Sequence, residues 1–279
     1  MNGRSLSSGR IGIGAAIVIA SVIAIAALTA LLLPQRQAAA GEPLLVYCAA
    51  GIKPPVQAIA RRYEQETGVK VQLQYGGSGT LLSSLRIAKT GDLFLAGDES
   101  YIRIGRDQGL LADSIPLARM RPGIAVRRGN PKGVKSVADL LREDVTVALA
   151  NPEAASIGKL TQKLLDTAGV WAALKPRVKV FKPTVTDIAN DIKLGTVDAG
   201  IVWDATAGQY PELEFIDAEP LASASETVTI AILAASHQQA AAMRFARYMS
   251  APDRGGEAFK EHHYEAVPGN AWTPRQEKP

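Results

Sequence analysis

The residues best suited to binding chemistry lie in a glycine-rich turn, residues 75–80, with the sequence YGGSGT. The alternating run 69–74 predicts a strand before it, and the apolar spacing of 81–88 predicts a helix after it. Glycines let a backbone approach another group closely, and Ser78 or Thr80 could cap the helix, whose first amides are unpaired donors. The turn therefore suits an anion, and the simpler alternative is that its glycines only form the turn. It is neither a P-loop nor a GxGxxG fingerprint.

The histidines and the cysteine do not favour an enzyme. Only His237, His262 and His263 occur, all near the C-terminal end, without a nucleophile spaced to pair with them and without metal-ligand spacing. The single cysteine, Cys48, lies in an apolar run and is expected to be a small core residue. We therefore expect a binding protein without catalytic residues, cofactor or metal site.

The first forty residues have the features of an export signal. Arg4 and Arg10 precede an uncharged apolar run at 11–33, and an Ala-Ala-Ala sequence ends at Ala40. The run is long enough to span a bilayer, so residues 1–40 are either a signal peptide cleaved after Ala40 or a retained signal anchor. In both cases the remainder is expected outside the cytoplasm, in the periplasm, and a retained anchor would tether it to the membrane through residues 11–33.

The basic charge of the whole chain comes mainly from this leader. The chain has 31 basic and 27 acidic residues, and the leader holds three arginines and no acid, which leaves 28 basic and 27 acidic residues for the rest. A net charge of +1 removes the main argument for a nucleic-acid partner.

Beyond the leader, predicted strands and helices alternate, which indicates α/β lobes with mainly parallel sheets. The predicted strands are often continuous apolar runs, as expected where both faces of a sheet are covered. Five positions lie at or just beyond the carboxyl end of such a strand, mostly where a helix begins: Gly51, Ser78, Ile157, Val185 and Trp203. Because ligands of open parallel sheets collect there, amides from helix N-termini could together hold one small anion.

Five segments, in order and with matching spacing, resemble the periplasmic molybdate- and tungstate-binding proteins of ABC importers. They are Val46–Gly51, Tyr75–Leu81, Gly91–Asp98, Asn151–Glu153 and Gly200–Trp203. The resemblance covers roughly residues 44 to 268. It implies a type II periplasmic binding fold, in which two α/β lobes close on a tetrahedral oxyanion. Lobe 1 would then comprise residues 44–121 and 225–268, lobe 2 residues 122–224, and residues 269–279 a loose tail.

The resemblance also implies a ligand-binding set, from which this chain departs twice. Ser78 corresponds to a family serine, and Ile157 and Val185 to donors of backbone amides. Gly51 stands where the family has a serine, and Trp203 where it has a tyrosine. Gly51 keeps only its amide, and Trp203 is a hydrogen-bond donor whose bulk reshapes the pocket. The alternative for Trp203 is simple packing.

The implied function is a receptor that captures molybdate or tungstate and delivers it to an ABC permease in the membrane, and a monomer is expected. The departures leave a second reading open, in which the same fold binds sulfate, phosphate, or a cation-containing or organic solute. Asp204 motivates the cation, since a carboxylate facing the cleft would repel an anion. Its alternative role is to cap the next helix.

Overall fold

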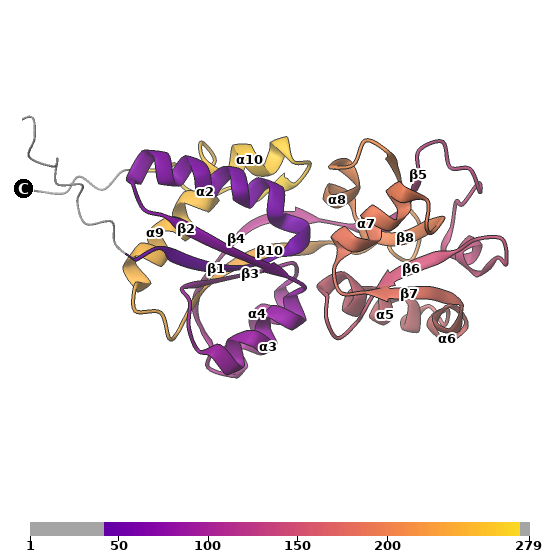
Figure 1. Ribbon diagram of the computed structural model, residues 1–279, viewed down its shortest axis with the longest axis horizontal. Coiled ribbons are helices and arrows are strands. Elements are labelled where there is room, and N and C mark those ends of the chain that lie inside the picture. The colour runs from indigo at the N-terminus through magenta and orange to yellow at the C-terminus, as the bar shows by residue number, and fades with distance from the viewer. Residues whose placement is uncertain (1–41, 274–279) are drawn as a thin grey trace, which may run out of the picture. The chain divides into compact units, whose positions relative to one another are not determined.

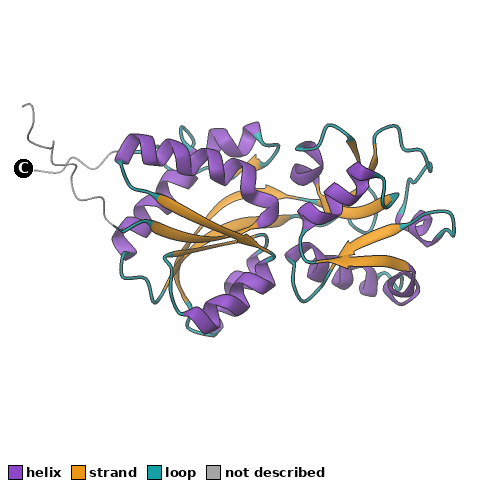
Figure 2. Ribbon diagram, viewed as in Figure 1, coloured by secondary structure: helices purple, strands orange, loops and turns teal. Residues whose placement is uncertain are grey.

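The computed structural model describes residues 42–273, and its strands form two sheets (Figures 1 and 2). The leader of residues 1–40 lies outside the described residues. Among the helices of residues 42–273, none combines the length and the apolar character needed to span a bilayer.

The first sheet has six strands in the order β11-β4-β10-β3-β1-β2. Their bounds are β1 Leu44–Ala49, β2 Val71–Gly76, β3 Leu93–Ala96, β4 Leu111–Met120, β10 Glu226–Leu233 and β11 Glu265–Ala266. The helices around it are α2 Lys53–Thr67, α3 Ser78–Ala88, α4 Glu99–Asp107, α9 Gln239–Ser250 and α10 Gly255–Glu261, and a short 3-10 helix, η1 Ala50–Ile52, leads into α2. We call this sheet and its helices the first lobe.

Both faces of the first sheet are covered, which explains why its central strands β1 and β3 are continuously apolar. In β3, Leu93 and Leu95 belong to one core cluster, whereas Phe94 and Ala96 belong to another. The first cluster packs under α2, α9 and α10, and the second packs under α3 and α4, on the opposite face in Figure 1. The same alternation places Cys48 in the first cluster, fully buried, as expected for a core cysteine.

The second sheet has five strands in the order β7-β6-β8-β5-β9. They are β5 Pro122–Arg127, β6 Val147–Ala150, β7 Val178–Lys182, β8 Ala199–Trp203 and β9 Leu213–Ile216. Its helices are η2 Val137–Leu141, α5 Ser156–Thr167, α6 Trp171–Leu174, η3 Lys175–Arg177, α7 Val185–Leu194 and α8 Asp204–Gly208. We call this sheet and its helices the second lobe.

Two connections join the lobes. Arg121 alone separates β4 from β5, and residues 217–225 lead from β9 back to β10. The Arg121 guanidinium ties the two connections together, because it lies 3.2 Å from an Asp217 carboxylate oxygen. We accordingly propose lobe boundaries at residues 121/122 and 224/225.

The two-lobed α/β fold predicted from the sequence is confirmed, but both sheets are mixed rather than mainly parallel. In the first sheet β1 pairs in parallel with β2 and β3, while β10 runs antiparallel to β3 and β4. In the second, β6 is parallel to β7 and β8, while β5 is antiparallel to β8 and β9. The antiparallel pairs involve the strands next to the connections, where the chain leaves one lobe and returns to it.

The start of the expected loose tail is instead held against the first lobe. The Trp272 ring lies edge-on to Tyr248 at a centroid distance of 5.0 Å, and its amide donates to Asp253 at 3.0 Å. The half-buried Trp272 ring thus attaches residues 269–273 to the core of the first lobe. Residues 274–279 of that expected tail lie outside the described residues.

Candidate functional site

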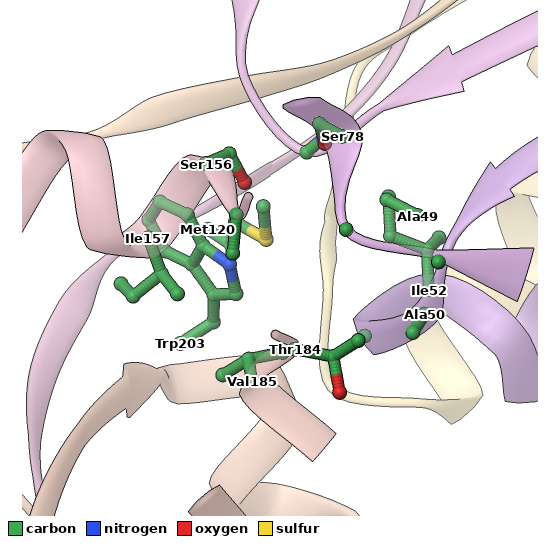
Figure 3. A pocket seen from close by; sticks show the side chains of 15 residues that line it. Ala49, Ala50, Ile52, Ser78, Met120, Ser156, Ile157, Thr184, Val185 and Trp203 are labelled. Carbon is green, nitrogen blue, oxygen red and sulfur yellow. The ribbon is translucent and has the colours of Figure 1, made fainter. Parts of the chain in front are cut away.

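A pocket between the two lobes brings together all five residues predicted as ligand-binding: Gly51, Ser78, Ile157, Val185 and Trp203. In Figure 3, Ser78, Ile157, Val185 and Trp203 surround one cavity, and Ala50 and Ile52 mark the η1 turn that holds Gly51. These positions came from five separate strand ends. The geometry of the two sheets directs all five ends toward the same place.

Four helices of ten or more residues begin at this pocket. The N-cap residues of α2, α3, α5 and α7 are Ile52, Gly77, Ala155 and Thr184, and all four line the pocket. Three of them provide no side-chain cap, and only Thr184 accepts a hydrogen bond from its own helix, from the Asp187 amide at 3.2 Å. The first turns of α3, α5 and α7 leave backbone N–H donors near the cavity, whereas α2 adds only the positive end of its dipole, because Pro54 and Pro55 have no N–H and the Lys53 amide donates to the Ala50 carbonyl. The arrangement is that of an anion site made from backbone.

Ser78 is the first residue of α3 and does not cap it. Its side chain is buried, and its Oγ accepts a hydrogen bond of 3.1 Å from the Gly97 amide. Because that bond uses an oxygen lone pair, the hydroxyl proton is free to be donated to an anion. Ser78 therefore does not have the capping role predicted from the sequence. Its hydroxyl is instead oriented by the Gly97 amide of a neighbouring loop.

Gly51 has lost more than a hydroxyl, because the space for its side chain is filled. A Cβ built on Gly51 would lie 2.7 Å from Val185 Cγ1 and 3.9 Å from Trp203 Cδ1. The Gly51 carbonyl accepts a 2.7 Å hydrogen bond from the buried Tyr264 hydroxyl. Burial raises the pKa of Tyr264, so this hydroxyl stays protonated and holds the η1 turn in place.

Trp203 ends β8, and its side chain is buried against the pocket. Figure 3 shows the indole nitrogen turned toward the interior of the cavity. An indole N–H can only donate, so it suits an acceptor-only ligand. The ring thus packs within the lobe, and its N–H faces the pocket, so its predicted role as a ligand donor stays a prediction.

Sequence reasoning missed Ser156. It precedes Ile157 at the start of α5, is buried, and lines the pocket with its hydroxyl directed inward (Figure 3). The signal in the sequence was a serine at a strand-to-helix turn, but such a serine is ordinarily an N-cap. Here Ala155 is the N-cap, and Ser156 is the first helical residue.

The glycine-rich turn contacts the second lobe directly. The Gly79 amide donates to the Ala154 carbonyl at 2.9 Å, and the Thr80 amide donates to the same oxygen at 3.3 Å. A Cβ on Gly77 would lie 2.3 Å from the Ala154 oxygen, and one on Gly79 would lie 2.2 Å from the Glu153 oxygen. The group that these glycines allow to approach is therefore the backbone of the opposite lobe. We call this contact the latch.

No charged side chain lines the pocket in the described part of the chain. Asp204 is one residue beyond Trp203 but is turned away from it. Its Oδ1 accepts hydrogen bonds from the amides of Arg121 at 2.9 Å and Ala205 at 2.7 Å. Its carboxylate thus anchors the start of α8 to the connection between lobes, but Asp204 is not the N-cap expected from the sequence, because the N-cap of α8 is Trp203 and Asp204 is its first helical residue. Within residues 42–273, histidines, cysteines and carboxylates nowhere cluster in a way that could hold a metal ion.

The cavity is small. The centre of a water molecule, of about 1.4 Å radius, can move within about 20 Å³ of this cavity, which is the volume of a sphere of about 1.7 Å radius. Adding the radius of the water molecule gives the cavity an equivalent radius of about 3 Å. This is the scale of one tetrahedral oxyanion. Pockets for drug-sized molecules are far larger, on the order of 300 to 1,000 Å³.

The chain belongs to the family of bacterial extracellular solute-binding proteins, whose pattern matches residues 44–265. A putative binding protein of Haemophilus influenzae is 30% identical over 209 residues, which are 75% of this chain and 85% of that protein. The molybdate-binding protein ModA of Mycobacterium bovis is 26% identical over 243 residues, 86% of this chain and 91% of that one. The resemblance proposed from the five motifs is therefore confirmed.

Two solved structures show the same fold. The periplasmic molybdate-binding protein of Azotobacter vinelandii superposes with a TM-score of 0.69 at 19% identity, covering 81% of this chain and all of that one. The periplasmic binding protein AfuA of Actinobacillus pleuropneumoniae, solved with fructose-6-phosphate, gives 0.69 at 18% identity and covers 84% of this chain and 87% of that one. At such identities the likeness concerns the fold alone.

Proposed function

We propose that this protein captures one tetrahedral oxyanion, molybdate or tungstate, between its lobes and delivers it to an ABC permease. The observation that carries the proposal is the cavity of about 3 Å equivalent radius at the meeting point of four helix N-termini. The relatives named as molybdate-binding proteins support the choice of anion. Gly51, Ser78, Ile157, Val185 and Trp203 are the proposed ligand residues.

The donors explain how a charge is bound without a counter-charge. Backbone amides at Ile157 and Val185, the Ser78 hydroxyl and the Trp203 N–H all donate hydrogen bonds. Each hydrogen bond to a charged group is worth roughly 1.5–3 kcal/mol, so a few of them offset much of the cost of removing the anion from water. Fixed backbone dipoles also need no reorganisation as the lobes close.

The same features disfavour the alternative ligands. An organic solute does not fit a cavity of this size. A cation would meet only donors and helix N-termini, since Asp204 is engaged elsewhere. Phosphate carries a proton near neutral pH, and no carboxylate lines the pocket to accept it. Sulfate has the same shape as molybdate and is therefore the informative competitor.

Export and delivery complete the proposal. The family of extracellular proteins and the features of residues 1–40 support action outside the cytoplasm, with the protein released or tethered. We propose a monomer that works by lobe closure, without chemistry on its ligand.

Isothermal titration of the full chain with molybdate, tungstate, sulfate and phosphate tests the ligand. The proposal expects tight binding of molybdate or tungstate and much weaker binding of sulfate and phosphate. A folded sample that gives heat with neither molybdate nor tungstate would refute it. A clear preference for sulfate would keep the oxyanion site and reject the proposed anion.

A further inference from the structure

We infer that Ser156 is a second hydroxyl ligand of the anion, presented from the second lobe opposite Ser78. The inference rests on the proposed oxyanion function and adds to it a residue that the family resemblance does not supply. It makes the pocket symmetrical, with one serine hydroxyl from each lobe.

Ser156 is buried, with only 6% of the residue's surface exposed, and none of the hydrogen bonds found among residues 42–273 uses its hydroxyl. Figure 3 shows the oxygen pointing into the cavity. The oxygen is not one of the fully buried polar atoms without a partner in the described residues, so it borders the open space of the pocket, where an anion that accepts its proton would take the place of water.

Gly97 shows that the two serines meet at the same place. Its amide donates to Ser78 Oγ at 3.1 Å, and a Cβ built on it would lie 2.5 Å from Ser156 Oγ. The two hydroxyls therefore flank one glycine from opposite lobes. A side chain at position 97 would displace Ser156 from the pocket. This clash explains why the residue at position 97 is a glycine.

Ser156 also compensates for the hydroxyl that is absent at Gly51. A serine side chain at position 51 would run into Val185, so the first lobe cannot supply a second hydroxyl there. Ser156 supplies one from the other side of the cavity. Because an anion must then touch hydroxyls of both lobes, full affinity requires the closed arrangement.

The test compares Ser156→Ala and Ser156→Thr with the unchanged full chain by titration with molybdate and tungstate. Loss of one hydrogen bond to a charged ligand should weaken binding by Ser156→Ala roughly ten- to a hundredfold. Ser156→Thr keeps the hydroxyl and should recover most of the affinity. The melting temperature without anion should stay nearly unchanged in Ser156→Ala, because the hydroxyl forms no hydrogen bond among the described residues, while the anion-induced rise should shrink.

Ser83→Ala is the control, since Ser83 is an exposed serine of α3 outside the pocket. It should bind the anion as the unchanged chain does. Unchanged affinity in Ser156→Ala, with tight binding by the parent, would overturn the inference and leave the proposed function standing. Absence of binding in the parent would overturn both.

Discussion

At the scale of single residues, the absence of a side chain at position 51 is matched to Val185. A Cβ on Gly51 would lie 2.7 Å from Val185 Cγ1, whereas Trp203 Cδ1, at 3.9 Å, is at ordinary contact distance. A hydroxyl at position 51 is therefore excluded by Val185 and not by Trp203. Replacing one residue alone should not restore the family arrangement.

Gly51→Ser should weaken anion binding rather than strengthen it. The new Cβ would lie 2.7 Å from Val185 Cγ1, a distance that real Cβ atoms do not show. Overpacking of this kind typically costs about 1–3 kcal/mol, which corresponds to roughly five- to a hundredfold in affinity. Titration with molybdate measures it.

The double variant Gly51→Ser with Val185→Ala removes the obstructing methyl group and should recover affinity, while Val185→Ala alone serves as the reference. Additive losses in the double variant would show that the two positions are not coupled.

Ser78→Ala should weaken binding roughly ten- to a hundredfold, because it removes a hydroxyl donor to a charged ligand. It also leaves the buried Gly97 amide without its acceptor, so some loss of stability is expected. Thermal unfolding without anion separates the two effects. Wild-type affinity in Ser78→Ala would contradict the role given to this residue.

At the scale of elements, the four helices at the pocket have weak or absent N-caps, and the glycine-rich turn serves closure. The latch places the second and third amides of α3, those of Gly79 and Thr80, on the Ala154 carbonyl, so a carbonyl of the second lobe caps a helix of the first. The Ser78 amide is the first of that helix and takes no part in the latch. Closure and ligand binding thus share the donors of one helix.

Gly79→Ala tests the latch. Alanine is favoured over glycine inside a helix by roughly 0.5–1 kcal/mol, so α3 should not be weakened. The new methyl would meet the Glu153 carbonyl at 2.2 Å, and a backbone atom cannot give way as a side chain can. We expect a native-like circular dichroism spectrum, at least roughly tenfold weaker binding of molybdate, and a larger radius in small-angle scattering with anion present. A compact, tightly binding variant would argue against the latch.

The sequence indicated most of these elements, because buried strands and glycine punctuation are local signals. It gave no sign of β4, since its residues follow no regular alternation of apolar and polar side chains and include Pro116, a residue that a strand interior usually excludes. The strand forms because β10 pairs along it, a non-local effect. The partner of the glycine turn and the role of Ser156 were hidden for the same reason, as both depend on the opposite lobe.

At the scale of the whole molecule, the connections between lobes carry charge as well as backbone. Arg121 bridges Asp217 on the other connection, and its amide is held by Asp204. Glu226 begins β10, opposite Met120 at the end of β4. The pKa of the Glu226 carboxyl is raised above its usual value, mainly by burial and to a smaller extent by the nearby Asp98 carboxylate.

Glu226→Gln should raise the melting temperature at neutral pH. A carboxyl whose pKa is higher in the folded than in the unfolded protein favours the folded state only when protonated. The folded protein therefore loses stability as the pH rises from the unfolded pKa through the folded one. The gain from glutamine should be fully present above that window and should vanish below it. Melting curves between acid and neutral pH measure the gain, with the exposed Glu143→Gln as control. A gain that does not depend on pH would contradict this explanation.

The most direct measurement is a crystal structure of the full chain grown with molybdate, with anomalous scattering used to locate the molybdenum. We predict one strong peak in the cavity between the lobes, with anion oxygens within hydrogen-bond distance of Ser78, Ser156 and the Trp203 N–H. A peak on the surface alone, or an empty cavity at saturating molybdate, would contradict the claim that these lobes close on an oxyanion.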